Sequence, residues 1–187
     1  MTPELNDFLK FYLPDQDLNL FKDYFHQFEI KKGRHLLKPG QDCSYLAFIQ
    51  QGCFRVYHYD IQDKEIITWF SFEKMVITDM LGFYTTGSAK FYVEALEDSI
   101  IYKISKQDLE KLYKLNNSFL NFGRKLAEES LTILMERTMA LQTKSAEDRY
   151  KELMTKPDFM QKIPLKYLAS FLGITDTSLS RIRKNIR

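Results

Sequence analysis

Two different periods of hydrophobic residues divide the chain. Over residues 28–104 the apolar positions form short β-rich runs with visible alternation, as at Phe54 and Val56. Turn signals that contain Gly, Pro or Asp separate the runs, which read FEIKK, HLLK, YLAFIQ, CFRVYHY, EIITWF, FYVEAL and SIIYKIS. Many short strands at this spacing predict a sandwich or jelly-roll barrel.

The segments on either side of this region have the period of helices. Residues 4–25 predict two short helices that Pro14 separates, because proline cannot continue a helix. After the strands, residues 107–115 predict a short helix, and a cap at residues 116–118 precedes a long helix over about residues 119–143. The chain is therefore expected to be of the α+β class, with a barrel followed by helices.

The predicted long helix carries two apolar faces. One face holds Phe119, Phe122, Leu126 and Ile133, and the other holds Ala127, Leu131, Leu134, Thr138 and Leu141 at 4-3-4-3 spacing. The second face has the spacing of a coiled-coil seam. We expect the first face to cover the barrel and the second to meet the same helix of another copy, which gives a symmetric homodimer. The alternative is a monomer in which one chain covers both faces.

Residues 145–187 predict several short helices. Ser145, followed by Glu147 and Asp148, has the pattern of a capped helix start. Further on, Ala169 lies where two helices would cross closely, and Gly173 lies at a turn that requires a left-handed residue. Two helices that meet at a tight glycine turn are typical of a helix-turn-helix. An ordinary helical hairpin is the alternative.

The second of these helices, residues 176–186, is expected to point Leu179 and Ile182 inward. Its candidate DNA-binding residues are Thr175, Asp176, Thr177, Ser178, Ser180, Arg181 and Lys184. Arg181 is the best candidate for a base-specific contact, because its guanidinium group can donate two hydrogen bonds, to O6 and N7 of guanine. Thr177 and Asp176 are weaker candidates for base contacts. Thr175, Ser178 and Lys184 suit phosphate contacts, which set the register on the duplex.

Charge supports this interpretation. Residues 162–187 hold six basic residues and one acid, a net +5 in a chain of net +2, so the rest carries −3. A basic segment on an acidic body favours a polyanionic partner, although a solvated basic tail has the same composition. The two cysteines make no CxxC pair and no metal spacing, and the sequence shows neither a signal-peptide pattern nor a membrane-length apolar run. We expect buried thiols, no membrane association and a cytoplasmic location.

With a predicted barrel, a long helix and a helix-turn-helix in this order, the chain resembles the Crp/Fnr family of bacterial transcription regulators. The resemblance covers nearly all of it, and the segments that carry it are IKKGRHLLKPG, YLAFIQQGCFRVY, FYVEALEDSIIYKISKQDLEKLY, SAEDRYKELM and PLKYLASFLGITDTSLSRIRK. The last three are similar to short Crp-type regulators of Bacteroidetes. The resemblance implies a cyclic-nucleotide-binding-like domain over residues 1–115, a dimerisation helix over 116–144 and a helix-turn-helix domain over 145–187.

The resemblance further implies a homodimer on a near-palindromic DNA site, with RNA polymerase and a small-molecule effector as further candidate partners. Most family members add a β-hairpin wing after the recognition helix. The printed sequence holds no such segment, so backbone contacts are expected from Lys166, Arg183, Lys184 and Arg187.

The effector pocket departs from the family's cyclic-AMP pattern. Thr78-Asp79 stands for the family's Gly-Glu pair, and Ala89-Lys90 for its Arg-Ser pair. Ala89 cannot bind a phosphate, and Lys90 would point to the other side of the strand. The adenine-facing positions are Leu134 and Met135. A buried phosphate without its arginine is costly, so we expect no cyclic-AMP binding, with Asp79 and Lys90 as a surface pair in the plainer alternative.

Other chemistries find little support in the sequence. Two cysteines are too few for an iron–sulfur sensor, and His26, His35 and His58 are each expected to be structural. A cupin-type enzyme would need an HxH metal pair, which does not occur, so we expect no enzyme and no cofactor. A ligand-binding or interaction module whose C-terminal helices only pack is the remaining alternative to a DNA-binding regulator.

Overall fold

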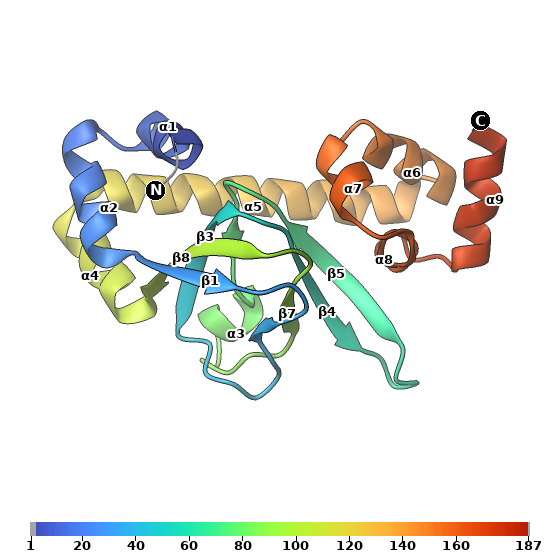
Figure 1. Ribbon diagram of the computed structural model, residues 1–187, viewed down its shortest axis with the longest axis horizontal. Coiled ribbons are helices and arrows are strands. Elements are labelled where there is room, and N and C mark those ends of the chain that lie inside the picture. The colour runs from blue at the N-terminus through green and yellow to red at the C-terminus, as the bar shows by residue number, and fades with distance from the viewer. Residues whose placement is uncertain (1–2, 187) are drawn as a thin grey trace. The chain divides into compact units, whose positions relative to one another are not determined.

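Two four-stranded sheets make up the β-rich part of the protein (Figure 1). The strand orders are β1-β8-β3-β6 and β2-β7-β4-β5, so neighbours in space are mostly not neighbours in sequence. The strands are β1 His26–Ile30, β2 His35–Leu37, β3 Tyr45–Gln51, β4 Phe54–Tyr59, β5 Glu65–Ser71, β6 Val76–Ile77, β7 Tyr92–Ala95 and β8 Ser99–Ser105. Each β-rich run predicted from the sequence forms a strand, and the two-residue strand β6 was not predicted.

This computed structural model describes residues 3–186, without the side chains at positions 4, 5, 7, 8, 11 and 22. The chain forms two compact units. The first comprises Met1–Val56 and Phe70–Glu128, and the second comprises Tyr57–Trp69 and Glu129–Arg187. The outer part of the β4–β5 hairpin thus belongs to the same unit as the C-terminal helices.

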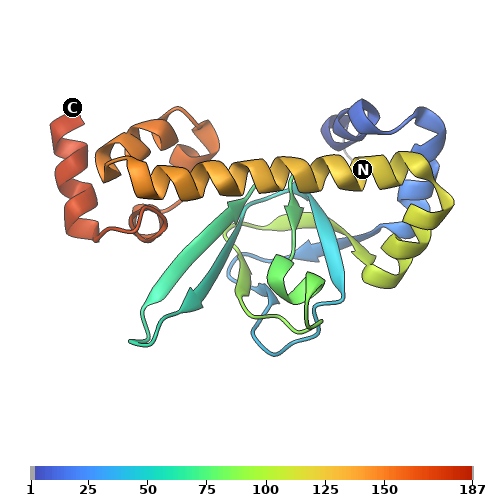
Figure 2. The ribbon, with the colours of Figure 1, turned by 180° about the vertical axis from the view of Figure 1, so that it is seen from behind.

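The helices of the described residues follow the predicted order, with additions. They are α1 Pro3–Tyr12, the 3-10 turn η1 Asp15–Asp17, α2 Leu18–Tyr24, α3 Met80–Tyr84, α4 Lys106–Leu115, α5 Asn117–Thr143, α6 Ala146–Met154, α7 Pro157–Lys162, α8 Leu165–Phe171 and α9 Asp176–Ile186. The break at Pro14 and the long helix are confirmed, and Figure 2 shows α5 as one uninterrupted helix. The short helices α3 and α7 were not predicted.

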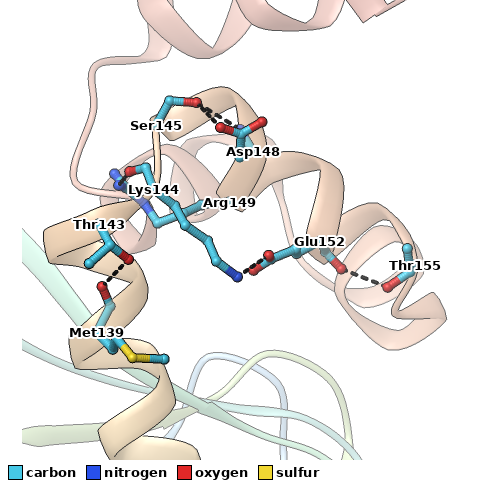
Figure 3. A network of polar contacts seen from close by, with 8 residues as sticks. All are labelled: Met139, Thr143, Lys144, Ser145, Asp148, Arg149, Glu152 and Thr155. Atoms are coloured by element: carbon cyan, nitrogen blue, oxygen red, sulfur yellow. Dashed lines mark hydrogen bonds and ion pairs between the residues drawn. The ribbon is translucent and has the colours of Figure 1, made fainter.

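Side-chain caps start the long helix and the one after it. The Oδ1 atom of Asn116 accepts the backbone N–H groups of Ser118 and Phe119, at 2.8 and 3.2 Å. The Oγ atom of Ser145 accepts the N–H of Asp148 at 3.1 Å (Figure 3). Such caps satisfy donors that have no partner within a helix, which is why these polar residues mark the helix starts.

An aromatic cluster forms the core of the first unit where helices cover the sheet. The ring of Phe48 on β3 stacks on that of Phe122 on α5 with centroids 5.5 Å apart, and Phe21 on α2 meets Phe48 edge-on at 5.9 Å. Phe119 and Phe122 are 1% and 4% exposed, whereas Leu126 is half-buried and Ile133 is 42% exposed, so the face predicted to cover the barrel is buried only over its first part. Burial of such large rings dominates the stability of a core of this size.

Gly52 joins β3 to β4 in a conformation that other residues rarely adopt. Its φ is +119°, and a Cβ atom at this position would lie 2.1 Å from the Oγ atom of Ser99. Both the backbone angle and the close approach of Ser99 therefore require glycine. Cys53, the next residue, and Cys43 form no disulfide and are fully buried, and this burial was predicted.

Candidate nucleic-acid interface and effector site

Helix α8 ends in a hydrogen-bonded glycine turn. Gly173 has a φ of +70°, its N–H donates to the carbonyl oxygen of Ser170 at 3.0 Å, and the N–H of Ile174 donates to that of Ala169 at 3.0 Å. These two bonds define a Schellman motif, in which a left-handed glycine closes the helix. The role predicted for Gly173 is confirmed.

Helix α9 begins at Asp176, four positions after Leu172 and directly after a threonine cap. The N–H of Ser178 donates to Oγ1 of Thr175 at 3.2 Å, and the two hydroxyl groups lie 3.0 Å apart. Asp176 follows in the first turn, where a negative charge is favourable. Thr175 therefore caps α9, and Ser178, which donates to this cap, is half-buried.

A small apolar core holds α8 and α9 together. Ala169 is 1% exposed, Leu172 3% and Leu179 2%, and Ile182 is half-buried. The prediction that Leu179 and Ile182 point inward is therefore confirmed for Leu179 and only partly for Ile182. The small side chain of Ala169 permits close packing where α8 is covered.

The opposite face of α9 is polar, basic and exposed. Thr177, Ser180, Arg181 and Lys184 lie at i, i+3, i+4 and i+7, so they share one side of the helix. Within residues 3–186, neither Arg181 nor Lys184 makes an ion pair or a side-chain hydrogen bond. Two exposed cations that are not neutralised within the chain are available to a polyanion.

The candidate backbone-contact residues lie in different settings. Lys166 is exposed, with its Nζ atom 4.6 Å from the ring centroid of Tyr167, and Arg183 is half-buried. Arg187 lies outside the described residues. The phosphate roles of these residues stay predictions.

The predicted seam of α5 lies open in the single chain. Leu131, Leu134 and Leu141 are 57%, 51% and 44% exposed, and Ala127 and Thr138 are exposed as well. Large aliphatic side chains seldom stay exposed in a row on a soluble helix unless another surface covers them.

Asp79 is the central residue of the predicted effector site. Its side chain is buried, with the residue 1% exposed, and it caps the short helix α3. Oδ1 accepts the N–H groups of Leu81 and Gly82 at 3.1 and 3.2 Å. Oδ2 accepts the N–H groups of Phe91, at 3.1 Å, and Lys90. One carboxylate thus accepts hydrogen bonds from four backbone N–H groups.

This geometry corrects the surface-pair interpretation of Asp79 and Lys90. Asp79 is buried and bonded to the backbone N–H of Lys90, and the lysine residue is exposed. The carboxylate is buried because backbone donors, rather than an ammonium group, compensate its desolvation. Ala89 is 1% exposed. Leu134 and Met135 are exposed and belong to the second unit, so their place in an effector pocket stays a prediction.

Neither a metal-ligand cluster nor a membrane-spanning helix is found among residues 3–186. Within the described part of the chain, no group of three or more His, Cys, Asp or Glu side chains is placed to hold a metal ion. In the same residues, no helix combines the length and the apolar character needed to span a bilayer. Of the histidines, His26 is exposed, whereas His35 and His58 are half-buried.

Sequence reasoning missed three residues that contact the end of α8. Arg137 on α5 and Arg149 on α6 donate to the carbonyl oxygens of Phe171 and Leu172, and Ser170 bonds to the backbone of β5. A charged residue on a helix is ordinarily solvated, and no local pattern marks a partner about 25 to 100 positions away in sequence. Only the fold brings these groups together.

Comparison with known proteins agrees with this architecture. Residues 27–116 match the family model described as the cyclic nucleotide-binding domain. FixK2 from Bradyrhizobium japonicum is similar at 16% identity and a TM-score of 0.75, over 87% of this chain and 84% of that chain. The global regulator CLP of Xanthomonas campestris is similar at 14% identity and a TM-score of 0.71, over 91% and 90%.

A third similar structure is a putative transcriptional regulator of the Crp/Fnr family from Eubacterium rectale. Its identity is 19% and its TM-score 0.71, over 99% of this chain and 86% of that chain. The search of the curated proteins found no match.

These findings define the fold. A segment that matches the model of the cyclic nucleotide-binding domain is followed by a long helix and by two short helices that meet at a glycine turn. The fold of the chain is that of the Crp/Fnr type of transcription regulator, and the resemblance inferred from the sequence is confirmed at this level.

Proposed function

We propose that the chain is a sequence-specific DNA-binding transcription regulator and not an enzyme. The observation that carries the proposal is the exposed face of α9, on which Thr177, Ser180, Arg181 and Lys184 lie together after a Schellman turn. A recognition helix of this kind enters the major groove, and its N-terminal residues reach the base edges. Arg181 reads a guanine, Thr177 and Asp176 make weaker base contacts, and Thr175, Ser178 and Lys184 contact phosphates.

The regulator acts as a homodimer through α5. The seam of Ala127, Leu131, Leu134, Thr138 and Leu141 supports this, since its leucines are about half exposed in one chain. Pairing with the same helix of a second copy buries these side chains and gives two recognition helices for two half-sites, about one helical turn apart.

The effector domain lacks the arginine that binds the phosphate of cyclic AMP in the family. The carboxylate of Asp79 already holds the backbone donors of Leu81, Gly82, Lys90 and Phe91. Ala89 adds no positive charge. CLP of Xanthomonas campestris is described as responsive to c-di-GMP. In the present chain neither Asp79 nor Ala89 supplies a positive charge for a phosphate, so we expect no binding of cyclic AMP.

A binding experiment tests the DNA proposal. Selection from a random duplex pool is expected to give a near-palindromic operator, and fluorescence anisotropy is expected to show binding that weakens steeply with salt. About six phosphate contacts per dimer correspond to a slope of about −5 in log K against log salt. No selected sequence, together with indifference to DNA at low salt, would favour the interaction module. Calorimetry with cyclic AMP and with cyclic di-GMP is expected to show no binding.

A further inference from the structure

Three consecutive residues at the end of α8 are each held by a different element of the second unit. They are Ser170, Phe171 and Leu172, and the elements are β5, α5 and α6 in that order. These contacts lie directly before the glycine turn that leads into α9.

Ser170 bonds twice to the backbone of β5. Its Oγ atom accepts the N–H of Ile67 at 3.0 Å and donates to the carbonyl oxygen of Glu65 at 3.1 Å. Residues i and i+2 of a strand present their backbone groups on the same edge, so one hydroxyl can serve both. The position of Ser170 is thereby fixed relative to the strand.

Arg137 holds the next residue from the side of α5. Its Nη2 atom donates to the carbonyl oxygen of Phe171 at 3.2 Å, and its guanidinium carbon lies 3.6 Å from the centroid of the Phe171 ring. A hydrogen bond and a stacked cation on one residue fix both its backbone and its side chain.

Arg149 links the ends of two helices. Its Nη2 atom donates to the carbonyl oxygen of Leu172 at 2.8 Å, and its Nη1 atom donates to that of Lys144 at 2.6 Å (Figure 3). Lys144 directly follows α5, so one guanidinium ties the end of the long helix to the end of α8.

The carbonyl groups at the end of α8 are thus fully used. The Schellman bonds occupy the oxygens of Ala169 and Ser170, and the two arginines occupy those of Phe171 and Leu172. These last carbonyls have no partner within the helix and would otherwise turn to water. The two guanidinium groups also interact favourably with the partial negative charge at the C-terminus of the helix.

The two arginines make an arrangement that is not optimal for stability. Neither forms an ion pair with any described residue, and Nη1 of Arg137 and Nε of Arg149 are buried without a hydrogen-bond acceptor. Burial, and to a lesser extent the charge of Arg149, lowers the pKa of Arg137 to about 10. Buried donors without acceptors cost free energy, and such sites persist chiefly where function requires them.

We propose that Arg137, Arg149 and Ser170 are positioning residues for DNA recognition, which together we call the α8 anchor. This inference rests on the proposed DNA-binding function. Only Leu172, Gly173, Ile174 and Thr175 separate α8 from α9, and the bond from Arg149, the Schellman bonds and the threonine cap hold these four residues. The direction of the recognition helix therefore follows from the position in which the α8 anchor holds the end of α8.

Four variants and one control test this role. Ser170→Ala removes both bonds to β5, whereas Ser170→Thr keeps the hydroxyl group. Arg137→Met and Arg149→Met keep a long apolar side chain without donors. Arg124→Met is the matched control, because Arg124 also lies on α5 but pairs with Glu128 at 2.5 Å and is not one of the residues that bond to the end of α8.

Three measurements on the full chain are compared. The dissociation constant for the selected operator is expected to rise about fivefold to tenfold in the alanine and methionine variants, as expected for one or two lost hydrogen bonds. Binding to a scrambled duplex and the melting temperature should change little. Hydrogen exchange at the amides of Gly173 and Ile174 should become faster by a similar factor. Ser170→Thr and Arg124→Met should behave like the parent.

The outcomes separate the two proposals. If the parent shows no sequence preference for DNA, the proposed function fails, and the exchange rates of Gly173 and Ile174 alone decide on the α8 anchor. Unchanged exchange in the alanine and methionine variants overturns the inference. A loss of operator affinity without faster exchange also overturns it, since the residues would then act by contacting DNA rather than by positioning α9.

Discussion

Arg55 on β4 and Glu94 on β7 form a buried ion pair. Nη2 of Arg55 lies 2.8 Å and Nε 3.2 Å from the same carboxylate oxygen, Oε2, and the arginine side chain is 6% exposed. Two donors on one oxygen fix the pair across neighbouring strands of one sheet. Its geometry leads to the first prediction.

Breaking this pair is expected to destabilise the first unit strongly. Arg55→Met leaves a buried carboxylate without its main partner and should lower the free energy of unfolding by about 3–5 kcal/mol. The double variant Arg55→Met, Glu94→Gln should lose less than either single change, because no uncompensated charge remains. Urea unfolding of the parent and the three variants measures this, and additive losses would contradict a direct coupling.

Acid is expected to weaken the fold through His35. Burial lowers the pKa of His35, and nearby Lys38 and Arg55 act in the same direction, although Nε2 lies 3.5 Å from Oε2 of Glu94. Arg55 already neutralises this carboxylate, so the effect of burial prevails. The unfolded chain therefore binds protons more readily than the folded one, and stability falls as pH drops below about 6.5.

Replacement of this histidine tests the acid effect. The free energy of unfolding of His35→Gln is expected to fall less than that of the parent between pH 7.5 and pH 5. His26→Gln, at an exposed position, serves as the control and should keep the dependence of the parent. Equal pH dependence in the parent and in His35→Gln would show that His35 is not responsible.

Substitutions on α9 should separate base reading from phosphate contact. Arg181→Ala is expected to cost about 1–3 kcal/mol per half-site and to relax specificity at one base pair, because the fork of an arginine reads guanine. Lys184→Ala should weaken all sequences alike and make the salt slope shallower by about one per half-site. Anisotropy and footprinting measure both. A footprint and sequence preference like those of the parent would disprove base reading by Arg181.

Leu131→Glu should dissociate the dimer. Two half-exposed leucines at a symmetric seam would be replaced by two carboxylates, and loss of their burial corresponds to an increase of at least about 100-fold in the dimer dissociation constant. Light scattering after gel filtration measures the mass. Thr132→Glu, outside the seam, is the control and should leave the dimer intact. A dimer that persists in Leu131→Glu would place the interface elsewhere.

Asp79 variants should show that one carboxylate serves two segments. Asp79→Ala leaves the amides of Leu81, Gly82, Lys90 and Phe91 without their acceptor. Asp79→Asn keeps a single acceptor oxygen, which can serve only one of the two pairs. Hydrogen exchange is expected to show all four amides unprotected in the alanine variant and one pair protected in the asparagine variant. Full protection in both would contradict the assignment.

Much of this architecture follows from local sequence patterns, and the exceptions have physical reasons. Gly173, Thr175 and Asn116 act where the sequence places them, because caps and left-handed turns depend on neighbouring residues. Helix α7 was not predicted, and it begins at Pro157 because proline is favourable in the first turn of a helix.

The effector region shows the limit of such reasoning. An aspartate two residues before Leu81 is a typical helix cap, and that local signal was present. The bonds from Asp79 to the amides of Lys90 and Phe91 join residues eleven and twelve positions apart. They form only because the folded chain brings the segment of Lys90 and Phe91 back to Asp79. For the same reason, the contacts of Arg137 and Arg149 with α8 could not be derived from the sequence.

The hydroxyl of Ser170 has a second consequence, for solubility. Strand β5 lies at the edge of its sheet, where free backbone groups can pair with another chain and start aggregation. Ser170 occupies the N–H of Ile67 and the carbonyl of Glu65 on that edge. The same small side chain that fixes the end of α8 therefore also shields an edge strand from pairing with a strand of another chain.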